Sequence, residues 1–184
     1  LGAKYGPLIY FSNEYWRLIT PIFLHGGLEH FFVNMYSLFI LGMVIEKFWG
    51  HRDFFLFYLI TGFAGNAFSY IFNFNSVSVG ASTSIYGLLA AYLFFILKNR
   101  QFMPNFWKQL RSVLFTIGVN FLISLRGDID LWGHIGGFVS GVLICVFAAP
   151  TLKDRAQLMD MNFYASIGSE LSDESETPVI DNAL

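Results

Sequence analysis

Charged residues are scarce in this chain of 184 residues. Only 13% of the positions are Asp, Glu, Lys or Arg, whereas a soluble domain carries about 25%. Two long stretches, residues 54–97 and 131–152, contain no charged residue at all. A water-soluble domain of this length does not need two such stretches, so we expect an integral membrane protein in the lipid bilayer.

Cysteine is rarer still. Cys145 is the single one, which excludes an intrachain disulfide and a thiolate metal site. The formal net charge of −2 says little about partners, because seven of the thirteen acidic residues follow residue 153. Nothing in this balance indicates a nucleic-acid partner.

The sequence does contain five apolar segments near the roughly 20 residues that a membrane helix requires. We expect spanning helices near residues 28–47, 53–73, 82–98, 109–125 and 132–149. The fourth is the least apolar, with fourteen uncharged residues between Arg111 and Arg126. The predicted fold class is therefore an all-α, polytopic membrane helical bundle.

The remaining parts differ from these spans. Residues 1–27 contain scattered glycine and proline and are predicted to form an irregular outer loop segment. Residues 28–149 form the predicted membrane domain, and residues 150–184 are acidic and polar, which is typical of a disordered cytoplasmic tail. Because the chain has no signal peptide and no initiator Met, we expect a fragment or a processed form.

Basic residues predict the orientation of the bundle. Eight of them lie at one set of segment ends and three at the other, and the richer side is expected to face the cytoplasm. The eight are Lys47, Arg52, Lys98, Arg100, Lys108, Arg111, Lys153 and Arg155, and the three are Lys4, Arg17 and Arg126. Segments 82–98 and 132–149 therefore begin on the outer side.

A serine and a histidine stand at the beginning of these two segments. Ser82 follows Gly80 in a short turn, and His134 opens the last apolar run. A histidine within a membrane span indicates a function, and we expect Ser82 as its partner. Histidine can take the proton of a serine nucleophile and return it to a leaving amine.

Two further patterns favour this pairing. Glycine recurs every four residues along the last segment, which lets two membrane helices approach closely. These glycines are Gly133, Gly137 and Gly141. His30 and Asn34 share one helical face, as do Ser82 and Tyr86. His30, Asn34 and the Ser82 amide offer hydrogen-bond donors for an oxyanion, one of which is worth about 2.7–4 kcal/mol.

In this order the motifs resemble those of the rhomboid intramembrane serine proteases. The matching residues are Glu14-Tyr-Trp-Arg17, His25, His30-Phe-Phe-Val-Asn34, Glu46-Lys47, Gly80-Ala-Ser82, Tyr86, His134, Gly137 and Gly141. The resemblance implies a Ser82 nucleophile and a His134 base stacked on Tyr86. It implies oxyanion donors from His30, Asn34 and the Ser82 amide, structural roles for the other motif residues, and no metal or organic cofactor.

The implied substrate is a single-pass transmembrane protein, cut at a small residue near a helix that unwinds easily. We expect a bacterial plasma membrane as the location, with the site toward the outer face. The usual core has six spans, and we expect the first of them to be lacking here. Thr83 stands where the family usually has glycine, and we expect its side chain beside the substrate site, so that Thr83→Gly widens the accepted residue.

Other assignments remain open from the sequence. Ser84 is a weaker nucleophile candidate, because it lies about 200° around the helix from Ser82. Asp130 suggests a triad but is expected to cap the last span or face water. His25 is expected to hold the outer loop. Glu14 and Arg17 are expected to pair, with little energetic value if fully exposed.

Three functions of different classes are compatible with these features. The protease is favoured. A catalytically inactive rhomboid-like module that binds membrane proteins is the alternative, and the presence of both Ser82 and His134 weighs against it. A small transporter or channel is the third, and the sequence shows no internal repeat or paired broken helices of the transporter kind.

Overall fold

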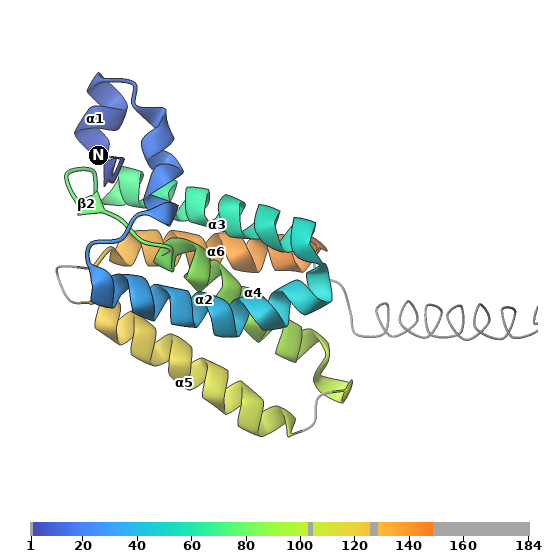
Figure 1. The fold of residues 1–184 in the computed structure, drawn as a ribbon. Coiled ribbons are helices and arrows are strands. Elements are labelled where there is room, and N and C mark those ends of the chain that lie inside the picture. Colours follow the sequence, from blue (N-terminus) through green and yellow to red (C-terminus); the bar gives the residue numbers. More distant parts are fainter. Residues whose placement is uncertain (1, 103–104, 126–128, 149–184) are drawn as a thin grey trace, which may run out of the picture. The chain divides into compact units, whose positions relative to one another are not determined.

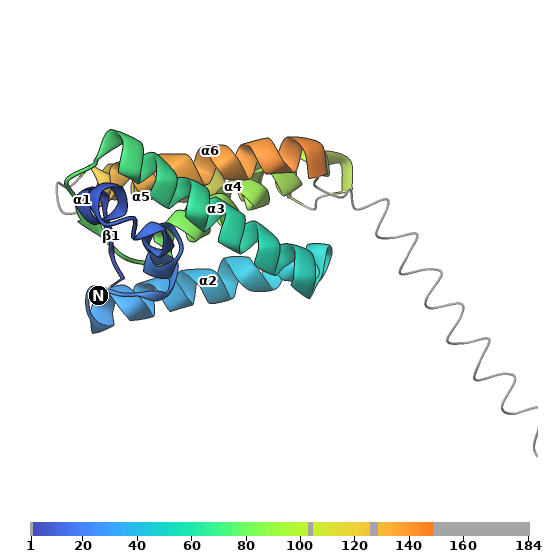
Figure 2. The same cartoon turned by 90° about the horizontal axis from the view of Figure 1, so that it is seen from above.

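The computed structural model describes residues 2–102, 105–125 and 129–148. Five long helices form the bundle, in agreement with the five apolar segments (Figures 1 and 2). They are α2 (Leu28–Trp49), α3 (His51–Phe72), α4 (Ser82–Lys98), α5 (Phe106–Ser124) and α6 (Leu131–Ala148). The expected acidic tail, residues 150–184, lies outside the described residues. The fold is an all-α membrane bundle.

Short elements connect and precede these helices. They are β1 (Lys4–Tyr5), α1 (Gly6–Phe11), η1 (Tyr15–Leu18), η2 (Thr20–Phe23), β2 (Val77–Ser78) and η3 (Arg100–Phe102). The two strands pair antiparallel, with Lys4 opposite Ser78. The N-terminal segment, expected to be irregular, is thus tied by a β-ladder to the loop that leads into α4.

Helix α4 lies at the centre of the bundle. It packs against α3 and α6 and also contacts α2 and α5 (Figures 1 and 2). Every residue from 83 to 91 is buried. The helix has 17 residues, so it is about 25 Å long, which is less than the roughly 30 Å hydrocarbon core of a bilayer. At least one end of α4 therefore stays below the membrane surface.

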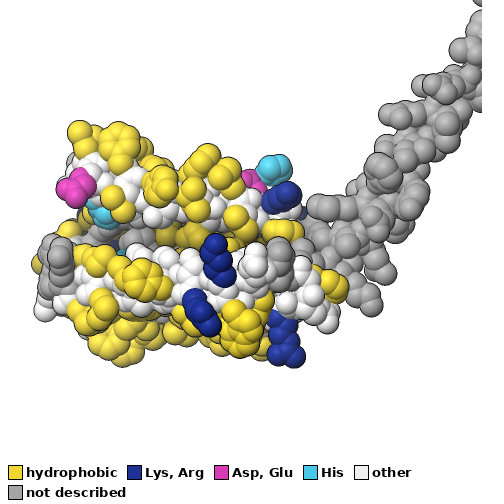
Figure 3. Space-filling view, turned by 90° about the horizontal axis from the view of Figure 1, so that it is seen from below, with side chains coloured by type: hydrophobic (Ala, Val, Ile, Leu, Met, Phe, Trp, Pro, Cys, Tyr) yellow, Lys and Arg dark blue, Asp and Glu magenta, His cyan; other side chains and the backbone are white. Residues whose placement is uncertain are grey.

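The outside of the bundle is suited to lipid. Helices α2 and α3 are long and apolar enough to cross a membrane, and α4 and residues Leu131–Phe147 are shorter apolar helices. Large apolar side chains such as Phe39 and Phe115 are exposed. In Figure 3, apolar side chains cover much of the visible face, and Lys and Arg gather toward the end where α5 begins.

Glycines allow α6 to touch α4. A side chain at Gly137 would overlap the backbone oxygen of Thr83, and one at Gly141 would lie 2.8 Å from the backbone oxygen of Gly87. The stripe of small residues predicted from the sequence therefore packs directly on α4. This contact fixes the relative position of the first turns of the two helices.

Candidate active site

Ser82 and His134 are in hydrogen-bond contact. Ser82 begins α4, and His134 lies in the first turn of α6. The Oγ atom of Ser82 is 2.8 Å from Nε2 of His134. His134 is buried, with 6% of its surface exposed. The structure thus brings together the two side chains that the sequence analysis paired.

Tyr86 holds one face of the imidazole. Its ring lies 4.1 Å from the His134 ring, centroid to centroid, at an interplanar angle of 12°, so the two rings are stacked. Tyr86 follows Ser82 by one helical turn, which is why one helix presents both side chains to His134. Phe121 of α5 contacts Tyr86 edge-on.

Ser124, the last residue of α5, contacts the edge of the imidazole that carries Nδ1, whereas Ser82 contacts the edge that carries Nε2. The Oγ atom of Ser124 is 2.7 Å from Nδ1 of His134 and 2.7 Å from the Tyr86 hydroxyl. Ser124 was not among the site residues expected from the sequence. A signal was present, because polar residues recur every four positions in the part of α5 after Arg111, which is otherwise apolar. These residues are Ser112, Thr116, Asn120 and Ser124.

Gly80 makes room for His30 beside the serine. Gly80 has φ +131°, a conformation that side chains disfavour. A Cβ atom there would lie 2.8 Å from Cε1 of His30 and 3.5 Å from Oγ of Ser82. The N–H of Gly26 donates to Nδ1 of His30 at 3.3 Å. The neutral His30 ring therefore carries its proton on Nε2, the atom beside Gly80.

Asn34 lies one turn after His30 on α2. Its Nδ2 donates to the backbone oxygen of His30 at 2.8 Å, and its side chain is buried. Both residues line a cavity of about 500 Å³ together with Ser82, Tyr86 and His134. Five residues expected at the site therefore meet around one cavity, whatever their individual roles.

The outer segment is held by a buried arginine. Arg17 pairs with Glu14, and its Nη1 donates to the backbone oxygen of Ala3 at 2.8 Å. Only 9% of Arg17 is exposed. The Glu14–Arg17 pair is therefore not an exposed surface pair of small energetic value, because Arg17 is shielded from water. Arg17 also binds the backbone of Ala3, the residue directly before β1.

Lys4 ties the N-terminal segment to the loop before Ser82 and was not singled out from the sequence. It is fully buried, and its Nζ donates to the backbone oxygen of Asn73 and to Oγ of Ser76, both at 2.7 Å. Burial lowers the pKa of Lys4, and the negative charge of Asp130 partly offsets this effect. The buried ammonium group thus depends on acceptors from the loop.

Thr83 does not lie where the sequence analysis placed it. Its side chain is buried between α3 and α6, where a Cβ atom at Gly65 would be 2.7 Å from Thr83 Cβ and one at Gly133 would be 3.1 Å from Thr83 Cγ2. It does not line the cavity over Ser82. The expectation was wrong because consecutive helical residues point about 100° apart.

The weaker alternatives are also resolved by geometry. Oδ1 of Asp130 accepts the N–H of Gly133 at 3.0 Å, so Asp130 caps α6 as expected. Ser84 Oγ donates to the backbone oxygen of Tyr58 at 2.7 Å, on the α3 side. The ring of His25 packs edge-on against His30. Burial, and then the charge of His30, lower the pKa of His25.

Known proteins are similar to this chain over most of its length. A family model described as the Rhomboid domain matches residues 12–151. RHOMBOID-like protein 1 of Arabidopsis thaliana is 37% identical over 144 residues, which cover 78% of this chain and 37% of that protein. Rhomboid protease GluP of Bacillus subtilis (strain 168) is 37% identical over 153 residues, covering 82% of this chain and 28% of that protein.

A relative described as inactive is similar to the chain as well. Inactive RHOMBOID-like protein 8 of Arabidopsis thaliana is 35% identical over 130 residues, covering 70% of this chain and 37% of that protein. The chain spans less than half the length of the curated relatives named here. With the family model matched from residue 12 to residue 151, the chain belongs to the rhomboid family.

Proposed function

We propose that the chain is an intramembrane serine endopeptidase that hydrolyses peptide bonds in or near transmembrane segments of membrane proteins. The observation that carries the proposal is the 2.8 Å contact between Ser82 Oγ and His134 Nε2 beside a cavity. A hydroxyl bonded to a buried imidazole is the arrangement that nucleophilic catalysis requires.

In the first half-reaction, His134 Nε2 takes the proton of Ser82 while Oγ bonds to the carbonyl carbon of the scissile peptide. The tetrahedral intermediate then collapses. His134 gives the proton to the leaving amine, the C–N bond breaks, and the acyl group stays on Ser82 as an ester. In the second half-reaction, water gives a proton to His134, its oxygen attacks the ester, and Ser82 recovers its proton.

The negative charge that develops on the carbonyl oxygen needs donors. Ser82 starts α4, so its backbone N–H has no acceptor one turn earlier in the helix and is free for the oxyanion. His30 offers the proton on Nε2, and Asn34 has a second N–H on the nitrogen that bonds to the His30 carbonyl. We assign the oxyanion to these three donors.

The proposed substrate is a single-pass transmembrane protein with a helix that unwinds easily.

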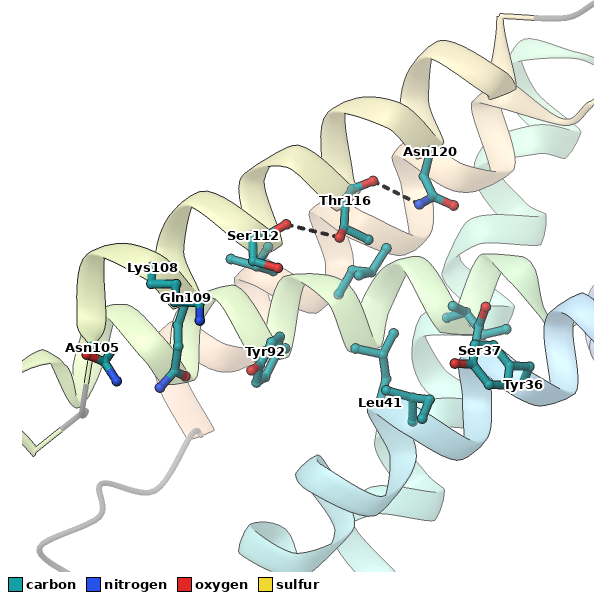
Figure 4. Close-up of a pocket in the computed structure, with 14 residues that line it drawn as sticks. Tyr36, Ser37, Leu41, Tyr92, Asn105, Lys108, Gln109, Ser112, Thr116 and Asn120 are labelled. Atoms are coloured by element: carbon teal, nitrogen blue, oxygen red, sulfur yellow. Dashed lines mark hydrogen bonds between the residues drawn. The ribbon is translucent and has the colours of Figure 1, made fainter.

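A groove beside α5 is the proposed path by which this substrate reaches Ser82. It is a cavity of about 570 Å³ between α2, α4 and α5, and it shares Ser37, Ile85 and Asn120 with the cavity over Ser82 (Figures 3 and 4). Figure 4 shows polar residues of α5 facing this groove, with Ser112, Thr116 and Asn120 joined by hydrogen bonds along the helix. We propose that α5 moves aside to admit the substrate.

The proposed orientation places the site toward the outer face of the membrane. The basis is the excess of Lys and Arg at the opposite segment ends. We propose a bacterial plasma membrane as the location, although the relatives named above come from a plant as well as a bacterium.

Fluorophosphonate labelling of the full-length protein in detergent tests the proposal. We expect labelling at Ser82, together with cleavage of a model single-pass membrane substrate. Ser82→Ala and His134→Ala should abolish both, and Ser84→Ala is the control because Ser84 faces α3. A folded wild-type protein that neither labels nor cleaves would overturn the proposal in favour of an inactive binding module.

A further inference from the structure

The Ser124 hydroxyl lies at a junction of three helices. Ser124 belongs to α5, whereas its neighbours Tyr86 and His134 belong to α4 and α6. Besides its contacts of 2.7 Å with each of these side chains, Oγ lies 2.8 Å from the backbone oxygen of Asn120. Only 2% of Ser124 is exposed, so the protein rather than water decides where its proton goes.

Only one arrangement of protons satisfies all three contacts of the Ser124 hydroxyl. The Asn120 carbonyl can only accept, and two oxygens 2.8 Å apart repel each other unless a hydrogen lies between them. Ser124 therefore donates its single proton to Asn120. Its two lone pairs then accept from the hydroxyl of Tyr86 and from Nδ1–H of His134.

The consequence reaches the nucleophile. A neutral imidazole carries one proton, and with that proton on Nδ1 the Nε2 atom is an acceptor. Nε2 is the atom 2.8 Å from Ser82 Oγ. The opposite tautomer would make Nε2 a donor toward Ser82, and His134 would be unable to take the proton.

We propose that Ser124 is a positioning residue that holds His134 in the Nδ1–H tautomer, so that Nε2 is free to deprotonate Ser82. In triad proteases a carboxylate performs this task. Asp130 does not perform it here, because its Oδ1 accepts the Gly133 N–H and the Nδ1 contact belongs to Ser124. This inference rests on the proposed protease function and adds a residue to it.

Substitutions at residue 124 test the role of the hydroxyl. Ser124→Ala should lower kcat by about 10- to 100-fold with little change in KM. This is less than the roughly 10⁴-fold loss caused by a wrong tautomer in a triad, because the freed ring samples both tautomers. Ser124→Thr keeps the hydroxyl and should retain most activity, whereas Ser124→Val, which has the shape of threonine without its hydroxyl, should not.

The matched control is Ser140→Ala, which removes a serine hydroxyl from α6 that lines neither the cavity over Ser82 nor the groove beside α5. Its kcat should stay within about twofold of wild type, since the Ser140 hydroxyl donates to the backbone oxygen of Gly137 in its own helix, at 2.9 Å. Thermal unfolding of all variants separates a loss of activity from a loss of folded protein.

A spectroscopic measurement addresses the tautomer itself. In protein labelled with ¹⁵N-histidine, the signals absent from His134→Ala identify His134. They should show Nδ1–H in the wild type and in Ser124→Thr, and a mixture of tautomers in Ser124→Val. A wild-type signal for Nε2–H, or an unchanged tautomer and kcat in Ser124→Val, would overturn the inference.

Fluorophosphonate labelling distinguishes a failure of the role of Ser124 from a failure of the protease function. If wild-type Ser82 labels but labels equally fast in Ser124→Val, the inference about Ser124 fails and the protease function stands. If wild-type protein does not label at all, the proposed function has failed first.

Discussion

A methyl group on Gly137 of α6 would overlap the backbone oxygen of Thr83 on α4. The two helices therefore touch backbone to backbone beside the Ser82–His134 contact, because Thr83 directly follows Ser82 and Gly137 lies about one turn after His134. Neither partner has a flexible side chain at this point that could move away.

Gly137→Ala should therefore separate α4 from α6 and remove activity. Overpacking costs about 1–3 kcal/mol, and a backbone obstacle belongs at the upper end of that range. Thermal unfolding and fluorophosphonate labelling measure the two effects. Gly118→Ala on α5 is the control, because a Cβ atom there meets nothing within 4 Å; a fully active, stable Gly137→Ala protein would refute the close contact.

Thr83→Gly should lower stability and leave cleavage preference unchanged. The buried Thr83 side chain fills the space between Gly65 and Gly133. Its loss leaves a cavity and places glycine in a helix, at a cost of about 1–3 kcal/mol. Cleavage of a substrate library with varied residues before the cut is the measurement.

Ile85→Ala provides the comparison for Thr83→Gly, because Ile85 lines the cavity over Ser82. This variant should change the pattern of accepted residues. A broadened pattern in Thr83→Gly instead would show that the threonine faces the substrate after all.

Gly80→Ala should slow catalysis while the bundle stays folded. The new Cβ atom would lie 2.8 Å from His30 Cε1 and would displace the ring from the oxyanion site. We expect a fall in kcat of about 10- to 100-fold, somewhat less than the loss of a complete oxyanion donor. Gly27→Ala, where a Cβ atom meets open space, should behave as wild type.

A crosslink between α2 and α5 should discriminate between substrates. Cysteines at Tyr36 and Thr116, which face the same groove, can be joined by a bifunctional thiol reagent. Cleavage of transmembrane substrates should stop, whereas small soluble substrates should still react. Equal inhibition of both classes would argue against access through this groove.

Stability should fall in mild acid through His25. Burial and the charge of His30 hold its pKa in the folded protein below the usual value of 6.5. As the pH drops below 6.5, the unfolded chain binds a proton that the folded chain resists, so unfolding becomes easier. Melting temperatures at pH 7.5 and 5.5 should differ more for wild type than for His25→Asn; the reverse order would exclude this role.

Much of the fold was accessible from the pattern of residues. A run without charge must be a helix in lipid, because every backbone group needs a partner there. The five helices accordingly follow the five apolar segments, and α4 begins and ends at the expected residues, Ser82 and Lys98. The pairing of Ser82 with His134 was predicted because both polar side chains stand at the start of apolar segments, and the glycine stripe lets the last helix approach a neighbour closely.

The side on which a residue faces was harder to predict. Thr83 was misplaced because its direction depends on which neighbouring helix offers space, and that space comes from Gly65, far away in the sequence. Lys4 was overlooked because its acceptors lie in a loop about seventy residues later.

The sequence by itself determined the solvent, the number of long helices and the two side chains that meet, because these follow from local composition and from helical spacing. Only the tertiary structure decided what surrounds them. The hydrogen bond between Oγ of Ser124 and Nδ1 of His134 joins α5 to α6, and the two residues are ten positions apart in the sequence. This bond exists because α4, α5 and α6 pack together around the Ser124 hydroxyl. The sequence of any one of these helices does not determine how the three pack.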